Sequence, residues 1–372
     1  MIMTGFNVCS RLRIMKKWII VTVVMLVVLV NEWLSYTFTA VRWPSVPSTQ
    51  GDSVRVLFAA DPQILSFQSD SEPAFPLNLV TIWDADRFVS RGFHLALWWT
   101  RPDIVVFLGD LLNDGSIFND SDFNSSLHHF RHLMHIPNYV KHTIFVPGDN
   151  DIGGEGLDQV TEHKVRRFFS FFNQTTTQQY KFVDFIQMRA MDDYDIATST
   201  LPRKDGRIRV LLSHMPLLLK TKSTIKKKIL EQHPSFIFSG HDHGSFHFKA
   251  SKTEAHAHEF HLLREEHHVW EFEGAGAQLH EVSVPTCSYR MGKQDTGYGL
   301  AVIEGSGKVL YTVLWLPSRF TQLWIYLTAL GLILTILLFG FINPIKNFLF
   351  QYLRAHHHAF TFLKVTLKYH RV

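Results

Sequence analysis

The chain has 372 residues, 46% of them hydrophobic, which allows one large domain or two small ones. Its 37 lysines and arginines exceed its 33 acidic residues by four, a balance that by itself is compatible with nucleic-acid binding. The excess lies at the two ends, because residues 1–17 carry four basic residues and 343–372 carry five, with no acid in either. Removing these nine leaves 28 basic against 33 acidic residues, which argues against a nucleic-acid partner.

The two basic ends flank apolar segments. Residues 18–34 are mostly apolar, and residues 323–342 are apolar almost throughout. About twenty apolar residues span a bilayer, so we predict transmembrane helices at 18–34 and 323–342. The first segment could instead be a cleaved signal peptide, but no small-x-small cleavage site follows it within 31–40, so we favour an uncleaved anchor.

The charge distribution also predicts an orientation. Basic residues beside a membrane segment stay on the cytosolic side, so both basic tails are expected there. The chain between the anchors is then lumenal. It divides into a linker at 35–53, rich in Pro, Ser and Gly over its second half, and a domain at 54–320.

Glycosylation acceptors and cysteines agree with a lumenal domain. Three Asn-x-Ser/Thr triplets fall within it, at Asn119, Asn124 and Asn173. The chain has two cysteines, Cys9 in the cytosolic tail and Cys287 in the lumenal domain. These two are separated by the membrane and cannot pair with each other, so the domain must depend on its hydrophobic core.

Five short apolar runs end in polar residues that suit metal binding. The runs are rich in β-branched and aromatic residues, are typical of buried strands, and cover 55–60, 104–108, 143–146, 209–213 and 236–239. Residues just past the carboxyl end of a strand lie in the crevice where open α/β sheets place their sites. Here they are carboxylates, imidazoles and amides, which suit Mn, Zn or Fe: Asp61, Gln63, Asp110, Asp149, Asn150, Asp151, His214, His241 and His243.

Other segments predict the rest of an α/β domain. Helical spacing occurs at 81–99, 123–134 and 160–172, and further strands that close a second sheet are expected at 269–272, 281–284, 300–303 and 309–316. A basic segment at 221–228 is typical of a solvated helix face. The histidine-dense segment 247–268 is compatible with a second metal site, but its alternation with Phe and Glu favours exposed strands or a hairpin.

The order of the five polar blocks resembles that of the calcineurin-like metallophosphoesterases, over roughly residues 54–315. The resemblance implies an α/β fold, a sandwich of two mixed β-sheets flanked by helices. It also implies a two-metal hydrolase with Asp110 bridging two divalent ions. In the family's pattern the remaining ligands divide into one set for each ion, namely Asp61, Gln63 and His243, and Asp149, His214 and His241.

The sequence departs from the family's pattern at three of these positions. Gln63 stands where the family usually has His, and Asp149-Asn150 stands where it has Asn-His. The resulting three carboxylates favour Mn²⁺ over Zn²⁺. The family's His commonly protonates the leaving group, whereas the Asn150 amide cannot supply a proton near neutral pH. Asp151 and His94 are the remaining candidates for that role.

Longer motifs resemble one branch, the membrane-anchored phosphoesterases that remodel glycosylphosphatidylinositol (GPI) anchors, known as the metallophosphoesterase 1 group and its fungal relatives. The motifs lie at 61–64, 107–111, 148–155 and 285–292. The resemblance implies Mn²⁺-dependent removal of ethanolamine phosphate from a GPI mannose, with GPI-anchored proteins or the GPI glycolipid as partners. It also implies residence between the endoplasmic reticulum (ER) and the cis-Golgi, although the C-terminus has no dilysine signal of the usual spacing.

Two residues and two other functions complete the hypotheses. Tyr289 and Arg290, just after a predicted strand, are candidates for contacting the glycan or phosphate, with a structural arginine as the alternative. The chain could also be a lumenal phosphatase with another substrate. A third hypothesis is a GPI-cargo-binding membrane protein whose substituted site binds without cleaving.

Overall fold

The computed structural model describes residues 3–47, 52–66, 74–188, 206–219, 222–274, 276–339 and 352. The chain divides into two compact units, one formed by Met1–Leu34 with Phe320–Val372 and the other by Ser35–Arg319. The predicted basic tail lies outside the described residues except for Tyr352, and so does part of the predicted linker.

Two helices have the length and composition of membrane spans. They cover Met15–Val41 and Arg319–Phe339, each with a mean hydropathy of 2.1. Both apolar helices expected from the sequence are therefore present, although 340–342 lie outside the described residues. The first is built from α1 (Met3–Leu29), the π-helix η1 (Val30–Leu34) and α2 (Ser35–Val41).

The predicted linker was wrong over its first seven residues, which form α2. The reason is packing within the larger unit. The ring of Tyr36 lies 6.3 Å from that of Phe88, and the Arg91 guanidinium lies 5.3 Å from the Tyr36 ring centre. Ala40 is also buried. These contacts give the segment a buried face, which a linker lacks.

Two mixed β-sheets form the larger unit, as the family resemblance implied. The six-stranded sheet has the order β10 (Trp270–Glu273), β13 (Lys308–Trp315), β12 (Gly297–Glu304), β1 (Ser53–Ala59), β2 (Ile104–Leu108) and β3 (His142–Val146). The seven-stranded sheet has the order β4 (Thr177–Tyr180), β5 (Val183–Gln187), β6 (Ile208–Leu212), β7 (Phe236–Ser239), β11 (Gln278–Ser283), β8 (Phe246–Ser251) and β9 (Ala257–Leu262). Strands β1–β2–β3 and β5–β6–β7–β11 are parallel.

The prediction that four later strands close a second sheet was wrong for three of them. Strands β10, β12 and β13 extend the sheet that contains β1, and only β11 joins the other. The cause is the pairing of β12 with β1, which is antiparallel from Ser53↔Glu304 to Phe58↔Gly299. Strand composition predicts that a strand exists, whereas the choice of neighbour depends on the folded chain.

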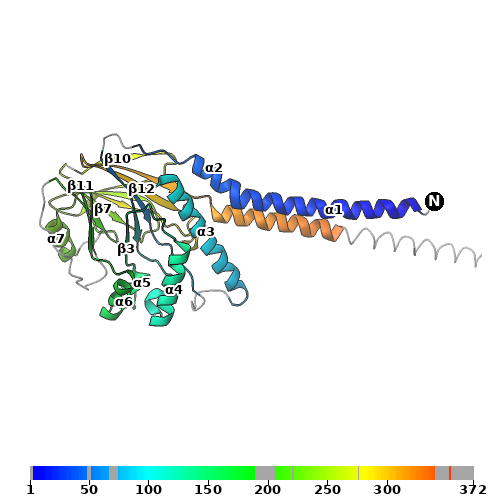
Figure 1. Cartoon of the computed structure of the whole chain (residues 1–372), viewed down its shortest axis with the longest axis horizontal. Helices are drawn as coiled ribbons and strands as arrows, with labels where there is room; N and C mark the ends of the chain where they lie inside the picture. Colours follow the sequence, from blue (N-terminus) through cyan, green and yellow to red (C-terminus); the bar gives the residue numbers. More distant parts are fainter. Residues whose placement is uncertain are drawn as a thin grey trace, which may run out of the picture. The chain divides into compact units, whose positions relative to one another are not determined.

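The core lies between the two sheets. The Phe58 and Phe238 rings, one from each sheet, stack with centroids 4.3 Å apart. Helices α3 (Leu77–Thr100) and α4 (Asp120–Leu133) lie on one side of the sheets and α7 (Ser223–Gln232) on the other (Figure 1). Together with α6 (Glu162–Phe172), α3 and α4 confirm the three helices predicted from spacing, and α7 contains most of the predicted basic helix.

The histidine-dense segment forms the β8–β9 hairpin, as favoured from its alternation. His258 and His261 are exposed on β9, whereas His247 is buried on β8. His247 Nε2 lies 3.0 Å from His280 Nδ1 on β11, so the two rings share a hydrogen bond. Burial lowers the pKa of His247 to about 3 and that of His280 to about 4, so this bond joins neutral rings near pH 7.

A buried acid on β11 makes the stability of the fold depend on pH. Glu281 accepts hydrogen bonds from Leu217 N (2.8 Å) and Leu218 N (2.7 Å), and burial raises its pKa from 4.5 to about 7. A raised pKa in the folded state means that the contribution of Glu281 to stability is fully present below about pH 4.5 and is lost as pH rises through 7, by roughly 3 kcal/mol. We expect Glu281→Gln to flatten this decline in chelator-treated protein, measured as the melting temperature across pH. A decline equal to that of the exposed control Glu231→Gln would contradict it.

Candidate metal centre

The candidate ligands lie in loops that follow β1, β2, β3, β6 and β7, where five strands end at one crevice. Five of these residues adopt positive φ angles, which are uncommon outside glycine: Asp61 (50°), Gln63 (44°), Asp110 (52°), His241 (69°) and His243 (57°). Such backbone strain persists only where the surrounding structure enforces it, and it clusters at functional sites. The loops are therefore shaped to aim these side chains inward.

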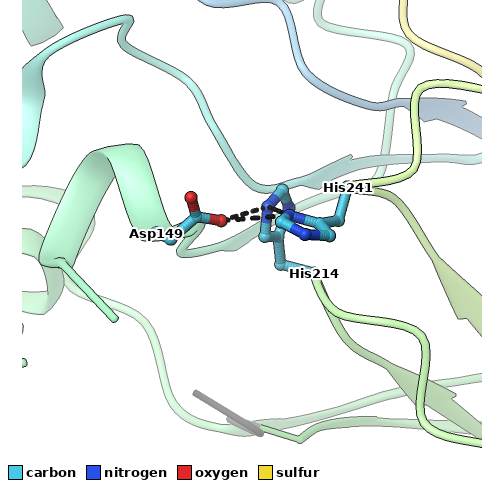
Figure 2. A group of neighbouring side chains, drawn as sticks. All are labelled: Asp149, His214 and His241. Atoms are coloured by element: carbon cyan, nitrogen blue, oxygen red, sulfur yellow. Dashed lines mark hydrogen bonds and ion pairs between the residues drawn. The ribbon is translucent and has the colours of Figure 1, made fainter. Parts of the chain in front are cut away.

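One group of side chains centres on Asp149, the first residue of α5 (Asp149–Ile152). Its Oδ1 lies 2.8 Å from His214 Nε2 and 3.2 Å from His241 Nδ1. Figure 2 shows the carboxylate, at the start of α5, and the two imidazoles, from two loops, pointing toward one another. Their ligand atoms are close enough to hold one metal ion.

A second group joins Asp61 and Asp110 to the same histidine. His214 Nε2 lies 3.4 Å from Asp110 Oδ1, and His214 Nδ1 lies 3.9 Å from Asp61 Oδ1. His243 also lies near this group, with Nε2 3.9 Å from Asp61 Oδ1. The two groups are thus contiguous, and with His243 they bring together six of the seven predicted ligands.

The tautomer of His214 follows from its backbone contact. Its Nδ1 lies 2.8 Å from the carbonyl oxygen of Leu108, the last residue of β2, and must donate a proton to that acceptor. Nε2 faces the carboxylates: it donates to Asp149 Oδ1 at 2.8 Å while the ring is protonated, and would offer its lone pair to a metal ion once that proton is lost. Ligating histidines commonly use their second nitrogen in this way.

Burial sets the electrostatics of the cluster. Burial and the charges of neighbouring carboxylates raise the pKa of Asp61 and of Asp110. Burial also opposes ionisation of Asp149, but hydrogen bonds from His214 and His241 outweigh it and lower the pKa of this group. Burial, with His241 and His214 beside it, lowers the pKa of His243 to about 4, so its ring is neutral near pH 7 and suited to a metal.

The surroundings of one carboxylate oxygen show whether a cation would fit this cluster. Asp61 is fully buried, and its Oδ2 has no hydrogen-bond donor among the residues that the structure describes. A buried carboxylate oxygen without a donor costs free energy unless a proton or a cation satisfies it. Carboxylates and neutral imidazoles together are the donor set of divalent transition-metal sites. The residues present therefore fit divalent metal ions.

The two amide side chains contact Asp110. Gln63 Nε2 donates to Asp110 Oδ2 at 3.2 Å, and Asn150 Nδ2 donates to the same oxygen at 2.8 Å. The backbone N–H of Asn150 donates to Asp110 Oδ1 at 3.0 Å. Both amides therefore orient this carboxylate, and Gln63, predicted as a ligand, lies in the cluster as its hydrogen-bond donor.

Asp151 has a positioning role in the structure. Its buried carboxylate accepts from Gly148 N (2.9 Å), Leu111 N (3.2 Å) and Leu112 N (3.1 Å), which ties the loops after β2 and β3 together. Burial and the nearby Asp110 charge raise its pKa to about 7. With three backbone donors and no exposed surface, it has no direct path to a leaving group.

The other sequence candidates have contacts elsewhere. His94 is exposed on α3 and its Nδ1 bonds to the Ser90 carbonyl at 2.7 Å, within its own helix. Tyr289, in the short helix Tyr289–Met291, is buried and donates to Asp84 Oδ2 at 2.8 Å. Arg290 follows it and is partly buried. Neither His94 nor Tyr289 has a described contact with the cluster.

Two features of the site were not predicted from the sequence. The Leu108 carbonyl that orients His214 leaves no signal in the sequence, because any residue offers a carbonyl. Glu155 is an exposed residue beside the cluster, where a hydrogen bond to Asp149 and the charge of that carboxylate raise its pKa. Glu155 ends the motif at 148–155, and that position could have indicated that it belongs to the site.

Residues 54–245 match the sequence model of the calcineurin-like phosphoesterases. The chain is 24% identical over 291 residues to cell division control protein 1 of Saccharomyces cerevisiae, covering 67% of this chain and 54% of that protein. It is 23% identical over 194 residues to metallophosphoesterase 1 of Cricetulus griseus, covering 50% and 46%. The chain therefore spans about half the length of these curated relatives.

Among solved structures, purple acid phosphatase PPD1 from yellow lupin (Lupinus luteus) aligns with 73% of this chain and 53% of its own, at 14% identity and a TM-score of 0.45.

A glycine in the loop after β3 offers a test of the cluster. A Cβ added to Gly148 would lie 2.0 Å from Asp110 Oδ1 and 2.1 Å from Asp110 N, so Gly148→Ala must displace that carboxylate. We expect the purified variant to lose bound metal, measured by elemental mass spectrometry. Gly156→Asn is the matched control, because its added Cβ meets nothing within 4 Å and Asn tolerates its φ of 60°. Full metal content in Gly148→Ala would contradict the assignment of Asp110.

Proposed function

Because this chain belongs to the calcineurin-like phosphoesterase family, we propose that it is a membrane-anchored, metal-dependent phosphodiesterase that removes ethanolamine phosphate from a mannose of GPI anchors. The observation that carries the proposal is the buried cluster of carboxylates and imidazoles at the strand ends, with an Asp61 oxygen that lacks a donor among the described residues. The resemblance of four motifs to the GPI-remodelling branch supports the substrate.

The donor set divides between two ions in this proposal. Asp110 would be shared, and the remaining ligands would be Asp61 and His243 for one ion and Asp149, His214 and His241 for the other. Three carboxylates favour an oxygen-preferring ion, and we propose Mn²⁺. When bound by these residues, such ions would supply Lewis-acid charge for a phosphoryl oxygen and a water nucleophile.

The chain's own residues would orient and protect this chemistry. Gln63 and Asn150 hold Asp110 by three hydrogen bonds, two from side-chain amides and one from a backbone N–H. Asp151 keeps the loops after β2 and β3 at a fixed separation. Because Asn150 directs its donors at Asp110, it is a positioning residue rather than a proton donor to the leaving mannose oxygen.

Membrane attachment supports the choice of a lipid-linked substrate. The two apolar helices at the ends of the phosphoesterase unit would tether it on both sides. A phosphodiester on a GPI glycan is presented at the membrane surface, so a tethered domain stays within its reach. We propose that this domain is lumenal, that the protein resides between the ER and the cis-Golgi, and that it assists transport of GPI-anchored proteins.

Hydrolysis by the purified protein tests the activity. With Mn²⁺, the full chain is expected to release ethanolamine phosphate from a GPI glycan, detected by mass spectrometry of the glycan. Asp110→Asn should abolish the release, and Asn150→Ala should slow it about 10–100-fold, the usual cost of losing a partner that orients a ligand. His94→Gln should leave the rate unchanged, since His94 bonds within α3.

Other outcomes would select the competing hypotheses. Hydrolysis of a nitrophenyl phosphomonoester without release of ethanolamine phosphate would indicate a phosphatase with another substrate. Retention of the GPI glycan by the metal-loaded protein without any hydrolysis would indicate a cargo-binding protein. Either result would refute the phosphodiesterase proposal while leaving the metal centre intact.

The lumenal orientation has a separate test. Asn119, Asn124 and Asn173 are all exposed, but the Asn119 side chain caps α4, with Oδ1 accepting from Asp122 N at 3.0 Å. We expect glycosidase treatment to increase the electrophoretic mobility of the protein, and the Asn124→Gln/Asn173→Gln pair to remove most of that change. Digestion of the catalytic unit by protease added to the cytosolic side of sealed membranes would refute the orientation.

A further inference from the structure

A cavity of about 400 Å³ lies in the larger unit, apart from the metal cluster. Three parts of the chain line it. These are the end of α2 with the residues after it, the segment after β9, and the end of β13 with the residues that follow. The residues that matter for its chemistry are Arg42, Trp43, Arg264, Glu266, Asp295 and Trp315.

Both apolar helices join the phosphoesterase unit at this cavity. Thr39 lines it from inside the first apolar helix, Met15–Val41, and Arg42 follows that helix directly. Ser318 lines it from the other side and is the residue before the second apolar helix, Arg319–Phe339. In the membrane-anchored protein proposed above, residues this close in sequence to the ends of the two spans would lie at the level of the lipid headgroups.

The cavity combines unpaired positive charge with carboxylates. Arg42 is exposed and has no ion-pair partner among the residues that the structure describes. Arg264 is exposed as well, and its Nε is 4.0 Å from Asp295 Oδ2, at the limit of an ion pair. Glu266 adds a second exposed carboxylate. Guanidinium groups bind phosphate oxygens, and carboxylates bind ammonium groups, so the lining suits a ligand that carries both charges.

Two tryptophans give the cavity a fixed aromatic wall. Trp43 is buried and its Nε1 donates to the Trp315 carbonyl at 2.7 Å. The Trp315 Nε1 is buried and has no acceptor among the described residues. Tryptophan is enriched at the membrane interface, and its ring face attracts ammonium groups. The wall therefore suits the headgroup end of a lipid.

We propose that this cavity binds the headgroup of a zwitterionic phospholipid of the phosphoethanolamine or phosphocholine type. Arg42 and Arg264 would contact the phosphate, and Glu266, Asp295 and the tryptophan faces would contact the ammonium group. This site does not depend on the proposed hydrolysis, because it involves none of the cluster residues.

The sheet topology places this cavity and the candidate metal ligand Asp61 at the same end of one sheet. Strand β13 is antiparallel to β12, which is antiparallel to β1, so β13 and β1 run in the same direction. Their carboxyl ends, at Trp315 and Ala59, therefore lie at the same edge of one sheet, and Asp61 follows β1 at that edge. A bound headgroup would hold the edge that carries the metal ligands against the bilayer surface.

Native mass spectrometry of the full chain in detergent tests the site. The protein is incubated with phosphatidylethanolamine, phosphatidylcholine or phosphatidylglycerol, and retained lipid is measured. Wild-type protein is expected to retain either zwitterionic lipid, and Arg42→Gln/Arg264→Gln to retain at least tenfold less, corresponding to loss of about 1.4 kcal/mol. The matched control, Arg166→Gln/Lys227→Gln, removes two other exposed charges of the same unit and should retain lipid normally.

A second variant separates charge recognition from a folding defect. Glu266→Gln/Asp295→Asn removes the ammonium partners and should shift retention toward the anionic phosphatidylglycerol, with an unchanged melting temperature. Three results would overturn the proposal: equal retention by the Arg42/Arg264 variant, preference of the wild type for phosphatidylglycerol, or displacement of the lipid by equimolar soluble phosphoethanolamine. The last would indicate a site for small soluble phosphoesters instead of a membrane lipid.

Discussion

The crowding of Asp61, Asp110 and Asp149 around one histidine is the constraint on which the rest of the site depends. Two like charges about 4 Å apart repel by roughly 4 kcal/mol at the effective dielectric constant of a protein. Burial adds to this cost, which is why the pKa values of Asp61 and Asp110 are raised. The arrangement is stable only if positive charge is added, and His214 supplies part of it. Divalent cations would supply the remainder. The electrostatic free energy of holding the three carboxylates together, unfavourable without a metal, would become favourable when metal binds.

Two buried acids hold the ligand loops in place against this repulsion. Asp151 binds three backbone N–H groups from the loops after β2 and β3. Glu281, on the other sheet, binds the N–H groups of Leu217 and Leu218, just after the loop that carries His214. In each case a carboxylate outside the cluster replaces the regular strand pairing that the loops have left. The positive φ angles of the ligands persist because the loops on both sheets are fixed in this way.

The sequence was a better guide to which polar side chains lie together than to the arrangement of the strands around them. Apolar runs ending in Asp110, Asp149 and His214 predicted that these residues meet, because the carboxyl ends of neighbouring parallel strands lie at the same end of a sheet. Sheet membership was not predictable in the same way. Strands β12 and β13 have the composition of any buried strand, and their place beside β1 depends on pairing between residues more than 240 positions apart. The helix at the start of the predicted linker was missed as well, because it packs Tyr36 against Phe88, a residue distant in the sequence.

The two amides that depart from the family's pattern change how the shared carboxylate is held. Histidines at these positions would titrate between pH 5 and 8 and would alternate between donor and acceptor. Gln63 and Asn150 do not titrate, so both remain donors to Asp110 across that range. The groups that orient Asp110 are therefore the same between pH 5 and 8. In the proposed reaction, amides at these positions would favour a fixed ligand geometry over general acid catalysis, so bound cations would have to contribute more of the rate.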